Sequence, residues 1–149
     1  MQNYEDNQVD FFSKLYKKHG FSHKTLHWIS KETQTIRYIE LLRIFTMCDV
    51  SITSKVLDFG CGLGHLYKFL KDNNFLETWK IDYTGADINS AFIIEAKKLF
   101  PEGTFKIKDE SIYNERFDFV LCSGIFNLRF SKDFDIEAYY KTELKKLFD

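Results

Sequence analysis

Short apolar runs alternate with stretches of helical periodicity over the last hundred residues of the chain. Four apolar runs bounded by turn signals predict strands at 55–59, 82–87, 104–108 and 117–122. Between and after these runs, apolar residues recur at helical spacing and predict helices near 64–72, 90–100 and 134–148. Strands that alternate with helices form parallel β-α-β units, so we expect an α/β fold with a mostly parallel sheet.

The first fifty residues follow a helical pattern only. Apolar residues lie three or four positions apart in two stripes, Phe11, Phe12, Leu15 and Tyr16, then Ile36, Ile39, Leu42 and Phe45. Gly20 lies between the two stripes and predicts a break between two helices. We therefore expect a helical segment over 1–50 and an α/β domain over 51–149, packed as one unit.

Composition narrows the class of protein. The chain has 149 residues, 44% hydrophobic and 17% aromatic, which suits one ordered domain with a real core. A net charge of −1 gives no indication of a nucleic-acid or membrane surface. Three cysteines without a C-x-x-C pair favour a reducing compartment, and the sequence has neither a membrane-length apolar run nor a signal peptide. We expect a cytoplasmic protein without a membrane partner.

The segment 55–65 combines an apolar strand, an acidic residue and a turn with three glycines. Asp58 precedes Gly60, Gly62 and Gly64 in a D-x-G-x-G-x-G pattern. Glycines let a ligand lie against the main chain, and the following helix directs free N–H groups toward it. A dinucleotide fingerprint would place a third glycine where His65 stands. The alternative is a turn that serves helix–strand packing only.

Four segments in order resemble the motifs of class I S-adenosylmethionine-dependent methyltransferases. They are the glycine turn with Asp58, the acid Asp87 after the second strand, the segment 105–110, and the segment 117–127. The resemblance covers about residues 54–127. It implies S-adenosylmethionine as cofactor and a Rossmann-like three-layer α/β/α fold, here truncated to about four strands in the order 3-2-1-4.

The same resemblance implies roles for single residues. Asp58 would lie near the methionine portion of the cofactor, Asp87 would accept the ribose hydroxyls, and Asp109 or Glu110 would accept from the adenine amine. The full set of expected cofactor contacts is Asp58, Gly60, Cys61, Gly62, Gly64, Asp87, Ile88, Asp109, Glu110, Ser123 and Arg37. Phe126 is a candidate for an aromatic wall near the sulfonium, and Asn127 is a candidate for orienting a substrate group. The alternatives are a helix-dipole acid at Asp87 and a charged surface loop at Asp109.

The N-terminal segment resembles the leader of a subset of small methyltransferases, whose helix closes over the cofactor as a lid. Candidate lid residues are Tyr16, His19, Gln34 and Arg37, although exposed helix positions explain them as well. His19, His23 and His27 recur every four residues. We predict no metal site there, because Gly20 interrupts the helix that would align them and no acidic or cysteine ligand completes the set.

Four strands are fewer than the seven that the resemblance implies, and they leave the strand at 117–122 on an open edge. Natural proteins cover such edges. Three explanations stay open: the chain is a fragment of a longer enzyme, a homo-oligomer covers the edge, or the domain is reduced and binds cofactor without turnover.

The predicted activity is methyl transfer to an oxygen or nitrogen of a small molecule. Nucleic-acid amino-methylating enzymes of this fold carry a proline motif after the fourth strand, and the segment 122–126 has no proline. We therefore expect no DNA partner. The alternatives are a non-catalytic cofactor-binding module and a nicotinamide-dependent oxidoreductase. No catalytic residue or general base stands out.

Overall fold

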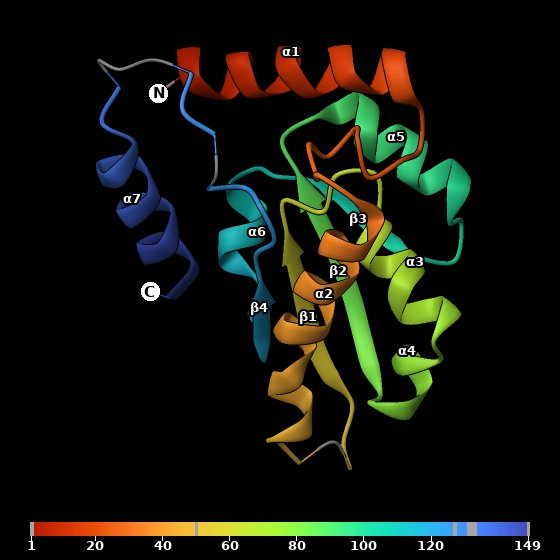
Figure 1. The fold of residues 1–149 in the computed structure, drawn as a ribbon. Coiled ribbons are helices and arrows are strands. Elements are labelled where there is room, and N and C mark those ends of the chain that lie inside the picture. Colours follow the sequence, from red (N-terminus) through yellow and green to blue (C-terminus); the bar gives the residue numbers. More distant parts are fainter. Residues whose placement is uncertain (1, 50, 127, 131–133, 149) are drawn as a thin grey trace.

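Four parallel strands form one sheet in the order β3-β2-β1-β4 (Figure 1). A computed structural model describes residues 2–49, 51–126, 128–130 and 134–148. The strands are β1 (Ser54–Phe59), β2 (Ile81–Asp87), β3 (Thr104–Ile107) and β4 (Phe119–Leu121). β1 lies in the middle, paired in parallel with β2 on one side and β4 on the other. The expected Rossmann-like order is therefore confirmed.

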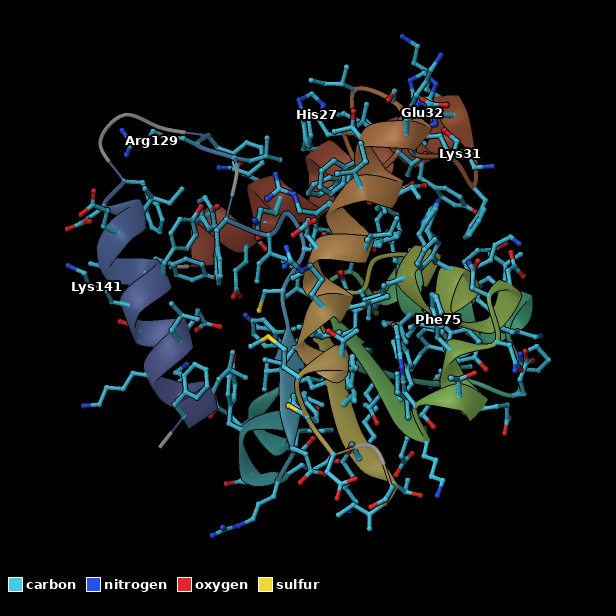
Figure 2. The ribbon with its side chains drawn as sticks, turned by 60° about the horizontal axis from the view of Figure 1, so that its bottom comes forward. His27, Lys31, Glu32, Phe75, Arg129 and Lys141 are labelled. Atoms are coloured by element: carbon cyan, nitrogen blue, oxygen red, sulfur yellow. The ribbon has the colours of Figure 1, made fainter. Side chains whose placement is uncertain are left out.

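Helices surround the sheet. Two long helices and a short 3-10 turn precede the first strand: α1 (Gln2–His19), α2 (Lys31–Leu42) and η1 (Arg43–Thr46). The strands are then followed by α3 (His65–Asp72), α4 (Phe75–Thr78), α5 (Ser90–Leu99), α6 (Glu110–Asn114) and α7 (Ile136–Phe148). In Figure 2 Lys141 points away from the body of the protein, on the outer side of α7. Within the described residues, no helix is both long and apolar enough to span a bilayer.

The central strand β1 is buried at five of its six residues. Val56 and Leu57 are fully buried, and their side chains point to opposite faces of the sheet, each into its own core cluster. Strands buried on both faces by helices read as continuous apolar runs, which is the pattern of a parallel sheet. Tyr38, Leu42 and Phe45 from the N-terminal segment belong to the larger of these clusters. The first fifty residues therefore share the core of the sheet.

Helix α1 lies across the end of the sheet where the strands finish, and its first turn approaches α7 (Figure 1). Tyr4 is buried at this junction, stacked on Phe134 with ring centroids 4.6 Å apart and tilted against Tyr139. Its hydroxyl donates to the carbonyl of Leu128 at 2.9 Å. An aromatic cluster thus joins the two ends of the chain above the carboxyl ends of the strands.

The observed elements differ from the predicted ones in two ways. β4 covers 119–121 instead of 117–122, because the Asp118 carboxylate accepts the Lys55 N–H at 2.7 Å, at the start of the ladder. Helices α4 and α6 were not predicted, since each is about one turn long and carries no full apolar period. Asn89 does cap α5, accepting from the N–H groups of Ala91 and Phe92.

Candidate functional site

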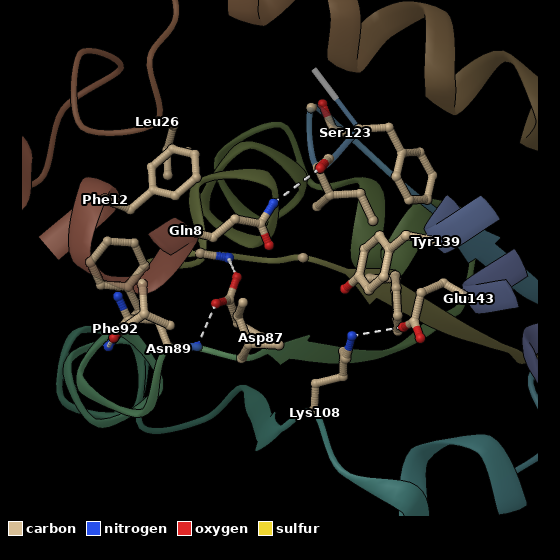
Figure 3. A pocket seen from close by; sticks show the side chains of 18 of the residues that line it. Gln8, Phe12, Leu26, Asp87, Asn89, Phe92, Lys108, Ser123, Tyr139 and Glu143 are labelled. Atoms are coloured by element: carbon tan, nitrogen blue, oxygen red, sulfur yellow. Dashed lines mark hydrogen bonds and ion pairs between the residues drawn. The ribbon is translucent and has the colours of Figure 1, made fainter. Parts of the chain in front are cut away.

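A pocket lies at the carboxyl ends of the strands, beneath α1 (Figure 3). Open α/β sheets bind ligands at this end, where the strand order reverses. Its volume is about 90 Å³, several times the roughly 10–15 Å³ that one water molecule needs. Its walls come from α1, the segment 26–28, the ends of β1, β2 and β3, the loop after β4, and α7. Segments far apart in the sequence therefore meet there.

The glycine turn forms the floor of this pocket. The N–H groups of Gly60 and Cys61 both donate to the carbonyl of Ala86, at 2.8 and 3.0 Å, and so tie the turn to β2. Gly60 has φ +86° and Gly62 has φ +56°, values that favour glycine. A Cβ on Gly60 would overlap Ile125, and one on Gly62 would lie 2.9 Å from Leu26. Only glycine fits at these two positions.

Asp87 ends β2 beside the turn. Its Oδ2 accepts the Gly62 N–H at 2.9 Å and its Oδ1 accepts the Asn89 N–H at 2.8 Å. Burial raises the pKa of Asp87, while these backbone N–H groups and the charge of Lys108 oppose that rise. Each carboxylate oxygen still has a lone pair for another donor. The carboxylate is thus held in one orientation and can accept hydroxyl groups of a ligand.

Asp58 lies behind the turn and does not line the pocket. It is 2% exposed, and its Oδ2 accepts the Tyr83 hydroxyl at 2.7 Å. Burial raises the pKa of Asp58 to about 7, aided by the charge of Asp87 and opposed by the Tyr83 hydrogen bond. In this structure Asp58 holds strands β1 and β2 together from within the core.

The other residues expected to contact the cofactor divide into two groups. Ile88 and Ser123 line the pocket, together with Gly60, Gly62 and Asp87. Cys61 is buried against Gly85, and Gly64 starts α3 with φ +84° against Phe105. Cys61 and Gly64 therefore lie on the side of the turn that faces the core. The structure therefore brings five of the expected residues to one cavity.

Asp109, Glu110 and Arg37 lie away from the pocket walls. Asp109 caps α6, and hydrogen bonds from the side chain and N–H of Ser111 lower its pKa. Glu110 is exposed on α6, and exposed Arg37 places its guanidinium 6.0 Å from the Trp28 ring centroid. In this structure their contacts are those of surface residues.

The candidate lid residues also lie outside the pocket lining. Tyr16 packs edge-on to Phe92, His19 ends α1, and the Gln34 amide donates to the Tyr38 hydroxyl at 3.0 Å. Phe126 does line the pocket, whereas Asn127 lies outside the described residues. No group of three or more potential metal ligands occurs among the residues that the structure describes.

Polar residues that the sequence analysis did not single out complete the pocket. Gln8 of α1 is 9% exposed and donates to the carbonyl of Ile125 at 3.4 Å. Lys108 donates to Glu143 of α7 at 2.7 Å and to Glu5 of α1 at 3.1 Å (Figure 3). The position of Lys108, just after β3, was a signal that could have identified it. Glu143 had none, because only packing brings α7 beside β3.

The arrangement suits a ligand that contains a nucleoside. A glycine turn offers main chain to a ligand without obstruction, and Asp87 beside it offers an oriented carboxylate to a sugar diol. Ile88 adds an apolar contact next to Asp87. Leu26 and Ile125 now lie over the turn, so a ligand along it requires both side chains to change rotamer.

Comparisons with known proteins agree with this geometry. A family model described as a methyltransferase domain matches residues 13–127. The structure of YjhP from E. coli covers 93% of this chain and 50% of its own length, at 20% identity and a TM-score of 0.54. The plantazolicin methyltransferase BpumL, solved with a pentazolic desmethylPZN analogue and SAH, covers 77% and 44%, at 19% identity and 0.54.

At these identities the two solved structures show the fold alone. The chain spans half or less of the length of each of them. A search of curated protein sequences found no match. The family model is therefore the comparison that bears on function.

Proposed function

Because the chain belongs to the class I S-adenosylmethionine-dependent methyltransferases, we propose that it carries the cofactor in the pocket beneath α1 and transfers methyl to a small molecule. The acceptor atom in this proposal is an oxygen or a nitrogen. S-adenosylmethionine is the cofactor of the family and, when bound, supplies a methyl group activated by a sulfonium sulfur. The family assignment favours methyl transfer over nicotinamide chemistry.

The observation that carries the proposal is the direct link between Asp87 and the glycine turn. The Gly62 N–H donates to Asp87 at 2.9 Å, so the acid and the turn are held as one unit. In the proposal Asp87 accepts the ribose hydroxyls, Ile88 contacts the adenine, and Gly60 and Gly62 admit the methionine portion. Such fixed orientation can contribute roughly 7–11 kcal/mol to a displacement reaction.

The overall charge supports a small acceptor. A net charge of −1 gives no indication of a partner with a nucleic-acid backbone. Cys48, Cys61 and Cys122 are free thiols, which fits the reducing conditions of the cytoplasm, the compartment that we propose. A cofactor-binding module without turnover is a second candidate, favoured by the four-stranded sheet of the described residues, which is smaller than the seven strands implied by the resemblance.

Calorimetry on two variants of β2 tests the proposed site. Asp87→Ala should weaken binding of S-adenosylhomocysteine, the demethylated product, by about 1–3 kcal/mol, because a charged acceptor is lost from the ribose contact. Asp82→Ala is the matched control, since Asp82 is exposed at the other end of β2. Equal affinity of wild type and Asp87→Ala would remove the ribose assignment. Binding without formation of S-adenosylhomocysteine from S-adenosylmethionine across an acceptor panel would favour the module.

A further inference from the structure

Charged and uncharged residues lie on different walls of the pocket. Asp87, Lys108 and Glu143 come from the ends of β2 and β3 and from α7. Lys108 and Glu143 form an ion pair, and Asp87 accepts two backbone N–H groups. The facing wall comes from α1, the segment 26–28 and the loop after β4. Its apolar members are Val9, Phe12, Leu26, Trp28, Ile125 and Phe126. Among the described residues that line this facing wall, none is charged.

Two neutral polar groups interrupt the facing wall. Figure 3 shows Gln8 between Phe12 and Ser123, above Asp87. The Gln8 amide is held by long hydrogen bonds, 3.3 Å to the Tyr4 hydroxyl and 3.4 Å to the Ile125 carbonyl. Ser123 Oγ is buried and has no hydrogen-bond partner among the described residues. Buried hydroxyls are nearly always paired, so an unpaired one that lines a pocket points to a ligand group.

The chemistry of this wall selects among acceptors. A charged molecule placed against it would lose its hydration without gaining an opposite charge, because no described residue of this wall is charged and Lys108 and Glu143 are paired with each other. In the proposed function the remaining charge, Asp87, is already bound to the ribose of the cofactor. A neutral molecule with an apolar body would instead gain the burial of that body. A single hydroxyl or amine on the molecule could satisfy Ser123 and Gln8.

We propose that the acceptor is an uncharged small molecule with an aromatic or aliphatic body, whose one hydroxyl or unprotonated aromatic amine is bound by Ser123 and Gln8. This inference rests on the proposed function, because it assigns the acceptor side of the same pocket. In it, Ser123 and Gln8 orient the nucleophile, and Val9, Phe12, Trp28 and Phe126 hold the body, while Leu26 and Ile125 move aside for the cofactor.

Three phenols of similar size and different charge test the inference. They are para-ethylphenol, which is neutral, para-hydroxyphenylacetate, which is an anion, and tyramine, which is a cation. Calorimetry on the full chain saturated with S-adenosylhomocysteine measures their affinities without turnover. We expect para-ethylphenol to bind at least about tenfold more tightly than either charged phenol.

Two variants separate recognition from folding. Ser123→Ala should weaken binding of para-ethylphenol by about threefold to tenfold, because one hydrogen bond is lost, and should still bind S-adenosylhomocysteine, which shows that the variant is folded. Ser51→Ala, at an exposed position remote from the pocket, should change neither affinity. Gln8→Leu should act like Ser123→Ala, since it keeps the volume and removes the amide.

The outcomes distinguish the two proposals. A chain that binds S-adenosylhomocysteine but binds a charged phenol as tightly as the neutral one, or binds none of the three, overturns the inference and leaves the proposed function standing. An unchanged affinity of Ser123→Ala and Gln8→Leu for para-ethylphenol overturns the assignment of the polar contacts. A folded chain that does not bind S-adenosylhomocysteine overturns the proposed function and the inference together.

Discussion

Two aspartates at the ends of neighbouring strands have opposite surroundings. Asp87 faces the pocket and accepts backbone N–H groups, whereas Asp58 faces the core and accepts the Tyr83 hydroxyl. The sequence predicts both acids as ligands, because both end a strand before a turn. The sequence motif does not show that Tyr83, on the neighbouring strand, donates the hydrogen bond to Asp58 that a ligand was expected to donate. Asp58 is therefore where local pattern and tertiary packing differ.

Asp58 gives the free energy of unfolding a pH dependence. Its pKa is about 7 in the folded protein, whereas in the unfolded chain it is close to 3.9. The stability from protonated Asp58 is complete below about pH 4 and is lost as pH rises through about 7. The loss is at most about 4 kcal/mol, since each tenfold difference in proton affinity corresponds to about 1.4 kcal/mol.

Urea unfolding at about pH 5 and about pH 8 measures this loss. Wild type should lose more stability between the two than Asp58→Asn, which keeps an acceptor for Tyr83 but does not ionise. Asp82→Asn should behave like wild type, because Asp82 is exposed. The same pH slope in wild type and Asp58→Asn would show that Asp58 is ionised throughout.

At the scale of elements, a buried ion pair joins helix α7 to the end of β3. The Lys108 side chain is 11% exposed and that of Glu143 is 4% exposed, with N and O 2.7 Å apart. Burial disfavours the charged Glu143, but hydrogen bonds from Lys108 and Tyr113 outweigh it and lower the pKa. The helix itself was predictable from apolar spacing. Its docking was not, because it depends on charges from elements distant in the sequence.

Removal of one member of this pair should be costly. Glu143→Ala should lower the free energy of unfolding by about 3–5 kcal/mol, because Lys108 would stay buried without its main partner. Glu115→Ala breaks a more exposed ion pair, between Lys106 of β3 and Glu115 at the end of α6. This variant should lose less than about 1 kcal/mol of unfolding free energy. Chemical denaturation of both variants measures the difference. Equal losses of unfolding free energy in the two variants would mean that the Lys108 ammonium is hydrated in Glu143→Ala and is not left buried without a partner.

At the scale of the whole molecule, the sheet ends at β4. The parallel direction of the strands was predictable from apolar runs separated by helices, whereas the order 3-2-1-4 was implied by the resemblance to the methyltransferase motifs. The resemblance also implied a helix above the floor of the pocket, but the residues of α1 that line it are Gln8, Val9 and Phe12 and not the predicted ones, and the side formed by α7 was not predicted. Ile112, Val120 and Leu147 belong to one apolar cluster beside β4, yet within the described part of the chain β4 has a paired strand on one side only.

We propose that a second copy of the chain covers this free edge. An unpaired strand edge offers N–H and C=O groups to another chain. Sedimentation velocity over a range of protein concentrations should then show a sedimentation coefficient that rises with concentration. A constant monomer value over that range would contradict the proposal.

The apolar contacts over the glycine turn have a consequence for timing. In the proposed site, Leu26 and Ile125 lie where the methionine portion of the cofactor, its tail, would run along the glycine turn. Entry of that tail must wait for the protein itself to open, so the association rate should level off as ligand concentration increases instead of following diffusion. The same two residues would then slow dissociation of the bound ligand, so its residence time would be long without any additional favourable contact.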